Sequence, residues 1–220
     1  MTARTYLFAA AAIQGLIVAG ASAQQDLRLA TATAGLTPTM FTVIGLEAGD
    51  VAGIFTSVRG TAEVDAVIAA RSAVQAAECA LKVALQECDP MEPEGFAAIQ
   101  SAIGATVQAK AVLESAVGAF VARAAGVLSE PQRQAMEIWR SAPAELAPEF
   151  RAVWWSPAES ALLLSALRAE RIALASQAPL SAAAGAVLSE ARGRAEVVRA
   201  RWCLDVNLAQ VSQAFEQAMQ

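Results

Sequence analysis

The chain has 220 residues, of which 56% are hydrophobic, 5% are aromatic and 17% are charged, and its formal net charge is −5. Its mild acidity and its lack of Lys/Arg blocks exclude the electrostatic pattern of a nucleic-acid-binding protein and give no basis for attachment to anionic lipid. Much of the hydrophobic fraction is alanine, the best helix former, whereas β-branched and aromatic strand formers are sparse. The composition therefore predicts an all-α protein.

Residues 1–23 have the pattern of a secretory signal peptide. Arg4 supplies the positive charge, Leu7 to Val18 supply a short apolar run, and Ala21-Ser22-Ala23 supply a small-residue cleavage site before Gln24. The alternative is a buried or membrane-spanning helix, but the apolar run is short and ends in small residues. We therefore expect a secreted, periplasmic protein. Loss of Arg4 with the signal peptide would change the net charge from −5 to −6.

No membrane span is expected after the signal peptide is removed. The uncharged run Leu29–Leu46 is long enough to raise the question, but it contains Gly35, Pro38 and five threonines. Residues 24–45 are rich in Ala and Thr and have weak periodicity, so they predict a flexible, loosely packed N-terminal arm with about one helical turn.

Residues 46–220 predict a single all-helical domain. Its first helix, residues 46–60, ends at Gly60, and its second helix, residues 61–87, is long and amphipathic. The apolar stripe of the second helix recurs every three or four positions and includes Val64, Val67, Val74, Leu81, Leu85 and Cys88.

The clearest break in the chain is Asp89–Gly95, where two prolines and a glycine fall within seven residues. Because the connection is short, the flanking helices are expected to pack antiparallel as a hairpin. The next helix, residues 96–127, carries a second stripe that we expect to be buried: Phe96, Ile99, Ile103, Val107, Leu113, Val117, Phe120, Ala124 and Val127.

Three further helices are predicted at residues 129–140, 156–174 and 188–219, with breaks that contain proline or glycine between them. No strand-like alternation bounded by turn signals is present. The expected fold is thus an all-α hairpin or bundle of about five to six helices, with long amphipathic antiparallel helices.

Four helix starts share one local pattern, at residues 46–50, 128–132, 155–159 and 188–192. A large apolar residue precedes the cap, a Ser caps the helix, and a Gln or Glu three positions later reaches back to the cap amide. Proline in the first turn lacks only an amide that would have no partner in the helix. The pattern is complete at 128–132 and 155–159 and partial at the other two starts.

The stretch Leu128-Ser129-Glu130-Pro131-Gln132 resembles the motif of the periplasmic LTxxQ proteins of the Spy and CpxP type, with Ser129 in place of Thr. The resemblance covers residues 46 to about 140. It implies a small helical dimer that acts as an ATP-independent chaperone or modulates an envelope-stress sensor, with unfolded clients or that sensor as partner. The chain departs from such proteins in being acidic, in its low charge content and in having two additional C-terminal helices.

Catalytic chemistry is not expected. The chain has no histidine, which excludes a His-based triad, and it has no G-x-S-x-G motif or P-loop. A metal site would need Cys, Met and carboxylate ligands, and Cys79, Cys88 and Met91 lack CxxC spacing. We therefore expect no enzyme, no metal and no cofactor. The alternatives to a chaperone are a structural or regulatory protein with one envelope partner and a metal-responsive protein.

Three cysteines, Cys79, Cys88 and Cys203, follow the signal peptide. Nine residues on one helix place Cys79 and Cys88 on opposite faces and about 13 Å apart along the axis, so they cannot bridge each other. A disulfide would join Cys203 to one of them, and we favour Cys88 because it ends its helix. The alternative is three buried, reduced thiols. A leftover cysteine would stay free or join two chains.

Tryptophans cluster around the Pro-rich break, where Trp139, Trp154 and Trp155 fall within seventeen residues. Such a cluster is a candidate apolar surface for clients or partners. The alternative interpretation, which we favour, is that these side chains fill the core of an alanine-rich bundle.

Overall fold

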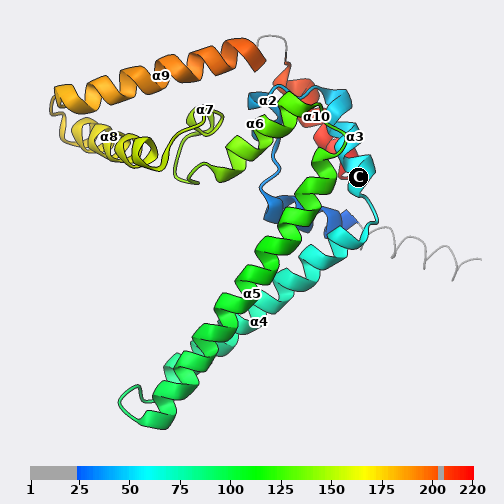
Figure 1. Ribbon diagram of the computed structural model, residues 1–220, viewed down its shortest axis with the longest axis vertical. Helices are drawn as coiled ribbons and strands as arrows, with labels where there is room; N and C mark the ends of the chain where they lie inside the picture. Colours follow the sequence, from blue (N-terminus) through cyan, green and yellow to red (C-terminus); the bar gives the residue numbers. More distant parts are fainter. Residues whose placement is uncertain (1–23, 203–205) are drawn as a thin grey trace, which may run out of the picture. The chain divides into compact units, whose positions relative to one another are not determined.

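The computed structural model describes residues 24–202 and 206–220, and every regular element in these ranges is a helix (Figure 1). The all-α prediction is confirmed. The predicted signal peptide, residues 1–23, lies outside the described residues. The chain divides into two compact units. The hairpin unit holds the described residues up to Gly35, Phe55–Gly126 and Met219–Gln220, and the C-terminal unit holds Leu36–Ile54 and Val127–Ala218.

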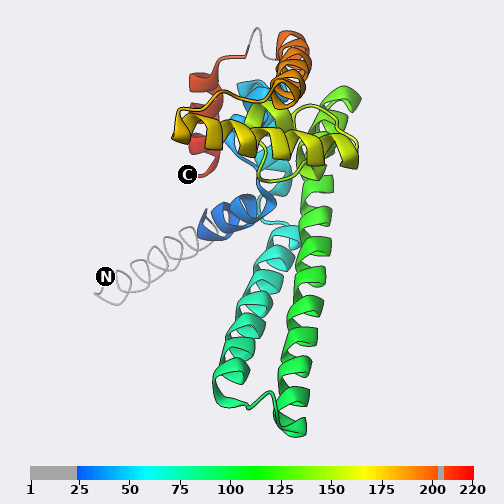
Figure 2. The same ribbon diagram turned by 90° about the vertical axis from the view of Figure 1, so that its left-hand side faces the viewer.

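The hairpin unit is built on α4 (Ala62–Glu87) and α5 (Pro93–Ala125), which lie side by side and antiparallel in both views (Figures 1 and 2). The predicted hairpin and its break are thus confirmed. Inward positions alternate by three and four residues, as in a coiled coil, and many of them are small. The buried residues of the two helices are Val64, Val67, Ala70, Ile99, Thr106, Val117, Phe120, Val121 and Ala124.

Two polar contacts fix the register of α4 against α5. The buried hydroxyl of Thr106 donates to the Ala102 carbonyl at 2.9 Å, and it also lies 3.3 Å from the carbonyl of Ala77 on α4. One turn beyond Thr106, Lys110 Nζ lies 2.8 Å from Glu78 Oε1. Both side chains of this ion pair are exposed, so the pair contributes little to stability. It does show which side of α4 and which side of α5 face the same way.

Residues 24–45 are more helical and more buried than the sequence predicts. Residues 24–34 form a helix with Leu27, Ala30 and Ala34 buried, and α2 (Pro38–Val43) follows with Met40 and Phe41 buried. The periodicity is weak because several buried positions hold Ala rather than a large apolar residue. Thr37 caps α2 by accepting a hydrogen bond from Met40 N at 3.1 Å, with proline in the first turn.

The C-terminal unit holds α2, the start of α3 (Ala48–Val58), and five helices from the second half of the chain. These are α6 (Glu130–Ser141), α7 (Pro148–Arg151), α8 (Pro157–Ser176), α9 (Ala182–Trp202) and α10 (Leu208–Ala218). α8 packs against α9, and α10 packs against α2. The main buried cluster is Leu146, Phe150, Val153, Leu163, Ala166, Leu188, Ala191 and Ala195.

The predicted start of the last helix at Leu188 is wrong. α9 begins six residues earlier, at Ala182, and Leu188 is fully buried within it. Ser181 provides the start, because its hydroxyl accepts a hydrogen bond from Ala184 N at 3.3 Å. A separate helix, α10, also replaces the end of the predicted 188–219 helix. The described residues contain more helices than the five to six expected. Residues 24–34 form a helix, α2 and α7 are too short to show periodicity, and α9 and α10 take the place of one expected helix.

Glycine substitutions test the tight turn of the hairpin. A Cβ added at Gly95 would collide with the Asp89 carbonyl, whereas a Cβ at Gly104 meets nothing within 4 Å. We expect Gly95→Ala to lower the free energy of unfolding by about 1–3 kcal/mol through overpacking. We expect Gly104→Ala, in the interior of α5, to raise it by about 0.5–1 kcal/mol. Urea denaturation measures both, and equal effects of the two substitutions would contradict the described turn.

Candidate functional site

The motif residues Leu128, Ser129 and Gln132 form a helix joint. Leu128 is buried, and Ser129 is the N-cap of α6. Gln132 Oε1 accepts hydrogen bonds from Ser129 N at 2.9 Å and from Ser129 Oγ at 2.8 Å. The predicted capping box is therefore present, and Pro131 lies in the first turn. The glutamine satisfies a backbone amide that the helix itself leaves without a partner.

The same glutamine joins the start of α6 to the start of α3. Gln132 Nε2 donates to Asp50 Oδ2 at 3.1 Å, and that oxygen also accepts from Glu47 N at 3.1 Å. Leu46 and Leu128, the apolar residues before the two joints, are both buried. The sequence identified both patterns separately, but it did not show that they meet. The motif thus acts as a cross-link within the C-terminal unit.

The joint at the start of α8 is built in the same way. Glu159 Oε2 accepts from Ser156 N at 2.9 Å and from Ser156 Oγ at 2.8 Å. Arg194 of α9 donates to Glu159 Oε1 at 3.0 Å, and its guanidinium lies 5.1 Å from the centre of the Trp155 ring. The start of α8 is therefore tied to the middle of α9, which is an anchor that the sequence pattern did not predict.

These contacts shift the ionisation of Glu159. The hydrogen bond from the Ser156 backbone amide, then those from the Ser156 hydroxyl and the Arg194 guanidinium, lower the pKa of Glu159 from 4.5 to about 2. Each of them favours the ionised carboxylate, and together they outweigh the opposing effect of burial.

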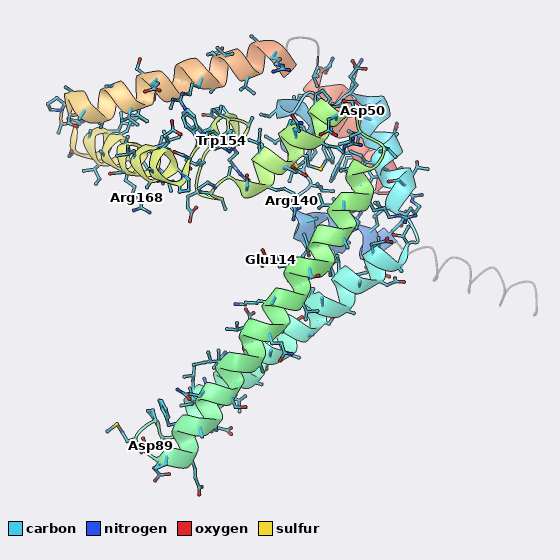
Figure 3. All side chains as sticks on the ribbon, in the orientation of Figure 1. Asp50, Asp89, Glu114, Arg140, Trp154 and Arg168 are labelled. Atoms are coloured by element: carbon cyan, nitrogen blue, oxygen red, sulfur yellow. The ribbon has the colours of Figure 1, made fainter. Side chains whose placement is uncertain are left out.

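The three clustered tryptophans have different environments. Trp139 is 4% exposed, and the guanidinium of Arg151 lies 4.6 Å from the centre of its ring. Trp155 is half-buried and donates from Nε1 to the Phe150 carbonyl at 2.8 Å. Trp154, which is labelled in Figure 3, lies in the connection between α7 and α8 and is 64% exposed. Two of the three therefore contribute to packing, and Trp154 alone among them presents most of its ring to solvent.

The cysteines lie apart from these joints. Cys79 is an exposed free thiol on α4, and Cys88 is a half-buried free thiol at the end of that helix. The interpretation as three buried thiols is therefore wrong for Cys79. Cys203 lies outside the described residues, so its pairing with Cys88 stays a prediction. Across residues 24–202 and 206–220, no group of three His, Cys, Asp or Glu side chains could hold a metal ion.

The hairpin carries an exposed apolar surface that the sequence placed in the core. Four side chains, which we call the hairpin face, remain about half-exposed or more: Leu85 at 59%, Phe96 at 51%, Ile103 at 46% and Val107 at 63%. The prediction that these side chains are buried is wrong, because each hairpin helix packs only a narrow seam of its surface on the other, and that seam includes Ile99 but not Ile103. The predicted apolar stripe is wider than this seam, so its residues outside the seam remain exposed to solvent.

Helical spacing places these four side chains on one side of the hairpin. Glu78 of α4 pairs with Lys110 of α5, so these two side chains lie on the same side of the hairpin. Leu85 follows Glu78 by seven residues. Ile103 precedes Lys110 by seven residues. Two helical turns return a side chain to nearly the same direction. Phe96 and Val107 flank Ile103 at seven and four residues and so share its side of α5.

α5 is apolar over most of its length, yet little of it is covered. By length and composition alone it is the one helix in the described residues that is long and apolar enough to cross a membrane, and 11% of its most apolar 18 residues are buried. The expectation of no membrane span stays a prediction.

The C-terminal unit also has a cavity of about 690 Å³ lined by residues of α2, α7, α8 and α9, with Phe150 and Leu167 among its apolar members. Arg192 in its lining pairs with Glu170 at 2.7 Å, and Arg199 pairs with Glu196 at 3.7 Å. The charges of both arginines are thus compensated within the protein.

A comparison with models of protein families finds no match, and neither curated proteins nor solved structures give one. The resemblance to LTxxQ proteins therefore rests on Leu128–Gln132 and on the N-terminal pattern. The family, the dimer and the periplasmic location that it implies stay predictions.

A double-mutant cycle tests the cross-link at the motif. Gln132→Glu keeps the acceptor for Ser129 N but places a carboxylate against Asp50. We expect it to lower the free energy of unfolding by about 1–3 kcal/mol, and we expect Asp50→Asn in the same chain to restore at least half of that loss. Urea denaturation of the four proteins measures the coupling. Additive effects of the two substitutions would show that Gln132 and Asp50 are not in contact.

The pKa of Glu159 predicts an acid-dependent weakening of the α8–α9 joint. Because its folded-state pKa lies below the usual 4.5, the carboxylate contributes stability above pH 4.5 that is lost as the pH falls towards 2. We expect NMR titration to give Glu159 a pKa near 2. Ser156→Ala, which keeps the backbone amide, should raise that pKa part of the way. A value near 4.5 in the unmodified protein would contradict the described contacts.

Proposed function

We propose that this protein is exported and works by binding other proteins, as an ATP-independent chaperone or envelope-stress modulator of the Spy and CpxP type. The signal-peptide pattern supports export, and the Leu128–Gln132 motif supports the class. The observation that carries the binding role is the exposure of the hairpin face. Its four apolar side chains lie on one side of the hairpin and are about half-exposed or more.

Burial of this surface supplies the driving force for binding. Transfer of apolar surface out of water contributes roughly 25 cal/mol per Å², and full burial of a Leu, Phe, Ile or Val side chain contributes about 1.5–3 kcal/mol. α5 has no charged residue from Gly95 to Ala109, so a partner would not need to desolvate a charge along this stretch. Binding of this kind requires no nucleotide.

A second candidate is a regulator that binds one specific envelope partner. The small size of the hairpin face favours it, because four clustered side chains fit the dimensions of a hot spot better than those of a general client surface. Both candidates use the same surface, and they differ in whether unrelated unfolded proteins are protected.

Aggregation assays test the proposal with the purified exported protein, whose N-terminus should be Gln24. We expect it to suppress aggregation of a chemically denatured client at near-stoichiometric ratios. Phe96→Ala together with Ile103→Ala should reduce the protection by about fivefold or more, because two of the four side chains of the hairpin face are lost. Alanine keeps the helix, so circular dichroism should be unchanged.

The matched control is Val83→Ala with Val112→Ala. These side chains are 44% and 53% exposed on the same two helices. Val83 is two residues from Leu85 and Val112 is five from Val107, so helical geometry turns both away from the hairpin face. The control should protect as well as the unmodified protein. Equal losses in the two variants would reject the hairpin face. No client protection together with recovery of one envelope partner would favour the regulator.

A further inference from the structure

We propose that the hairpin face selects partner segments that are both amphipathic and cationic, with apolar side chains flanked by Lys or Arg. The inference rests on the proposed protein-binding function and names the chemistry of the partner. It comes from the charges at the closed end of the hairpin, which are of one sign and lie at the same end of the hairpin as Leu85 and Phe96.

Four acidic residues surround the turn between α4 and α5. Glu87 ends α4, Asp89 and Glu92 lie in the connection, and Glu94 lies in the first turn of α5. The chain has no basic residue between Lys82 and Lys110. Figure 3 shows Asp89 at the closed end of the hairpin, whereas Glu114 lies far from that end on α5. This end of the hairpin therefore carries a concentrated negative charge.

No ion pair within residues 24–202 and 206–220 neutralises these carboxylates. Asp89 Oδ1 accepts a hydrogen bond from Met91 N at 2.8 Å, which leaves its charge in place. Lys110 is already paired with Glu78. Lys82 is then the nearest remaining cation in sequence, one positive charge against four negative.

The acidic and apolar groups share the closed end of the hairpin. Leu85 lies in the last turn of α4 and Phe96 in the first turn of α5, and Asp89 and Glu92 lie in the connection between them. Glu87 and Glu94 are two residues from Leu85 and Phe96, so they point to the opposite sides of their helices. Met91, 88% exposed in the turn, adds a flexible apolar side chain between the two helices. A partner helix that covered Leu85 and Phe96 would end near the connection, with its flanking residues towards Asp89 and Glu92. Charges act over about 10 Å at ordinary salt and about 30 Å at 0.01 M, so Glu87 and Glu94 add to the attraction mainly at low salt.

The dimensions suit one helix of the partner. From Phe96 to Val107 the face extends eleven residues along α5, or roughly 16 Å at 1.5 Å per residue, which is about three helical turns. An amphipathic helix offers apolar anchors at i, i+4 and i+7 over that length. The same negative charge disfavours an anionic lipid surface, so we assign the face to a protein segment.

Paired peptides provide the test. Two fluorescent 18-residue amphipathic helices share their Leu positions and carry either Lys or Glu at every charged position. Anisotropy with the purified protein should show the Lys peptide binding about tenfold more tightly at about 0.02 M salt, with the preference shrinking to about twofold at 0.5 M as the charges are screened.

Two charge-matched variants locate the effect. Glu87→Gln with Glu92→Gln and Glu94→Gln should weaken binding of the Lys peptide by about tenfold. Glu137→Gln with Glu145→Gln and Glu216→Gln removes the same number of negative charges from exposed positions in the C-terminal unit. It should change binding by less than about twofold, because those charges are not part of the hairpin.

The outcomes separate this inference from the proposed function. Equal binding of the two peptides, or equal effects of the two triple variants, overturns the preference for cations. Loss of binding in the Phe96→Ala, Ile103→Ala variant would then still support the hairpin face. Client protection without binding of either peptide also overturns the inference and leaves the function in place. Absence of both peptide binding and client protection rejects the function itself.

Discussion

The narrow seam between α4 and α5 determines the character of the hairpin. Most of its buried residues are Val or Ala, with Ile99, Thr106 and Phe120 as the others, so few large side chains are buried there. Thr106 fixes the register, because its buried hydroxyl must find acceptors, and it finds them at Ala102 and Ala77. Larger apolar residues outside the seam, such as Phe96 and Ile103, then stay in solvent, and the exposed surface is a direct consequence of the packing.

The C-terminal unit depends on a different device. Two of its helices, α6 and α8, begin with capping boxes whose acceptor side chains have a second partner on another helix. Gln132 bridges Ser129 and Asp50, and Glu159 bridges Ser156 and Arg194. A residue that satisfies its own helix end and also binds a neighbour fixes both the start of a helix and its position. The motif that resembles LTxxQ therefore has a structural role within this unit, and the surface assigned to partners lies elsewhere, in the hairpin unit.

Spacing and local chemistry predicted several elements well. The prolines and glycine of Asp89–Gly95 marked the turn of the hairpin, and Ser129 with Gln132 marked the start of α6. Prediction failed where the helical periodicity was weak, and where a helix-start pattern occurred inside a longer helix. Residues 24–34 bury Leu27 along with alanines, so their sequence predicts a loosely packed arm where the structure has a helix. The repeat of the joint at Leu188 fell inside α9, because the local pattern alone does not reveal a continuous helix.

The sequence by itself determined that the chain is helical, where the hairpin turns, and which residues cap α6 and α8. Those properties depend on a few neighbouring residues and on helical spacing. The tertiary structure decided which apolar residues are buried, since Phe96 and Ile99 have equal apolar character and only the position of α4 separates them. It also decided that Gln132 meets Asp50 and that Arg194 meets Glu159. Contacts between residues distant in the chain depend on how helices pack, and helical periodicity carries no information about the identity of the neighbour.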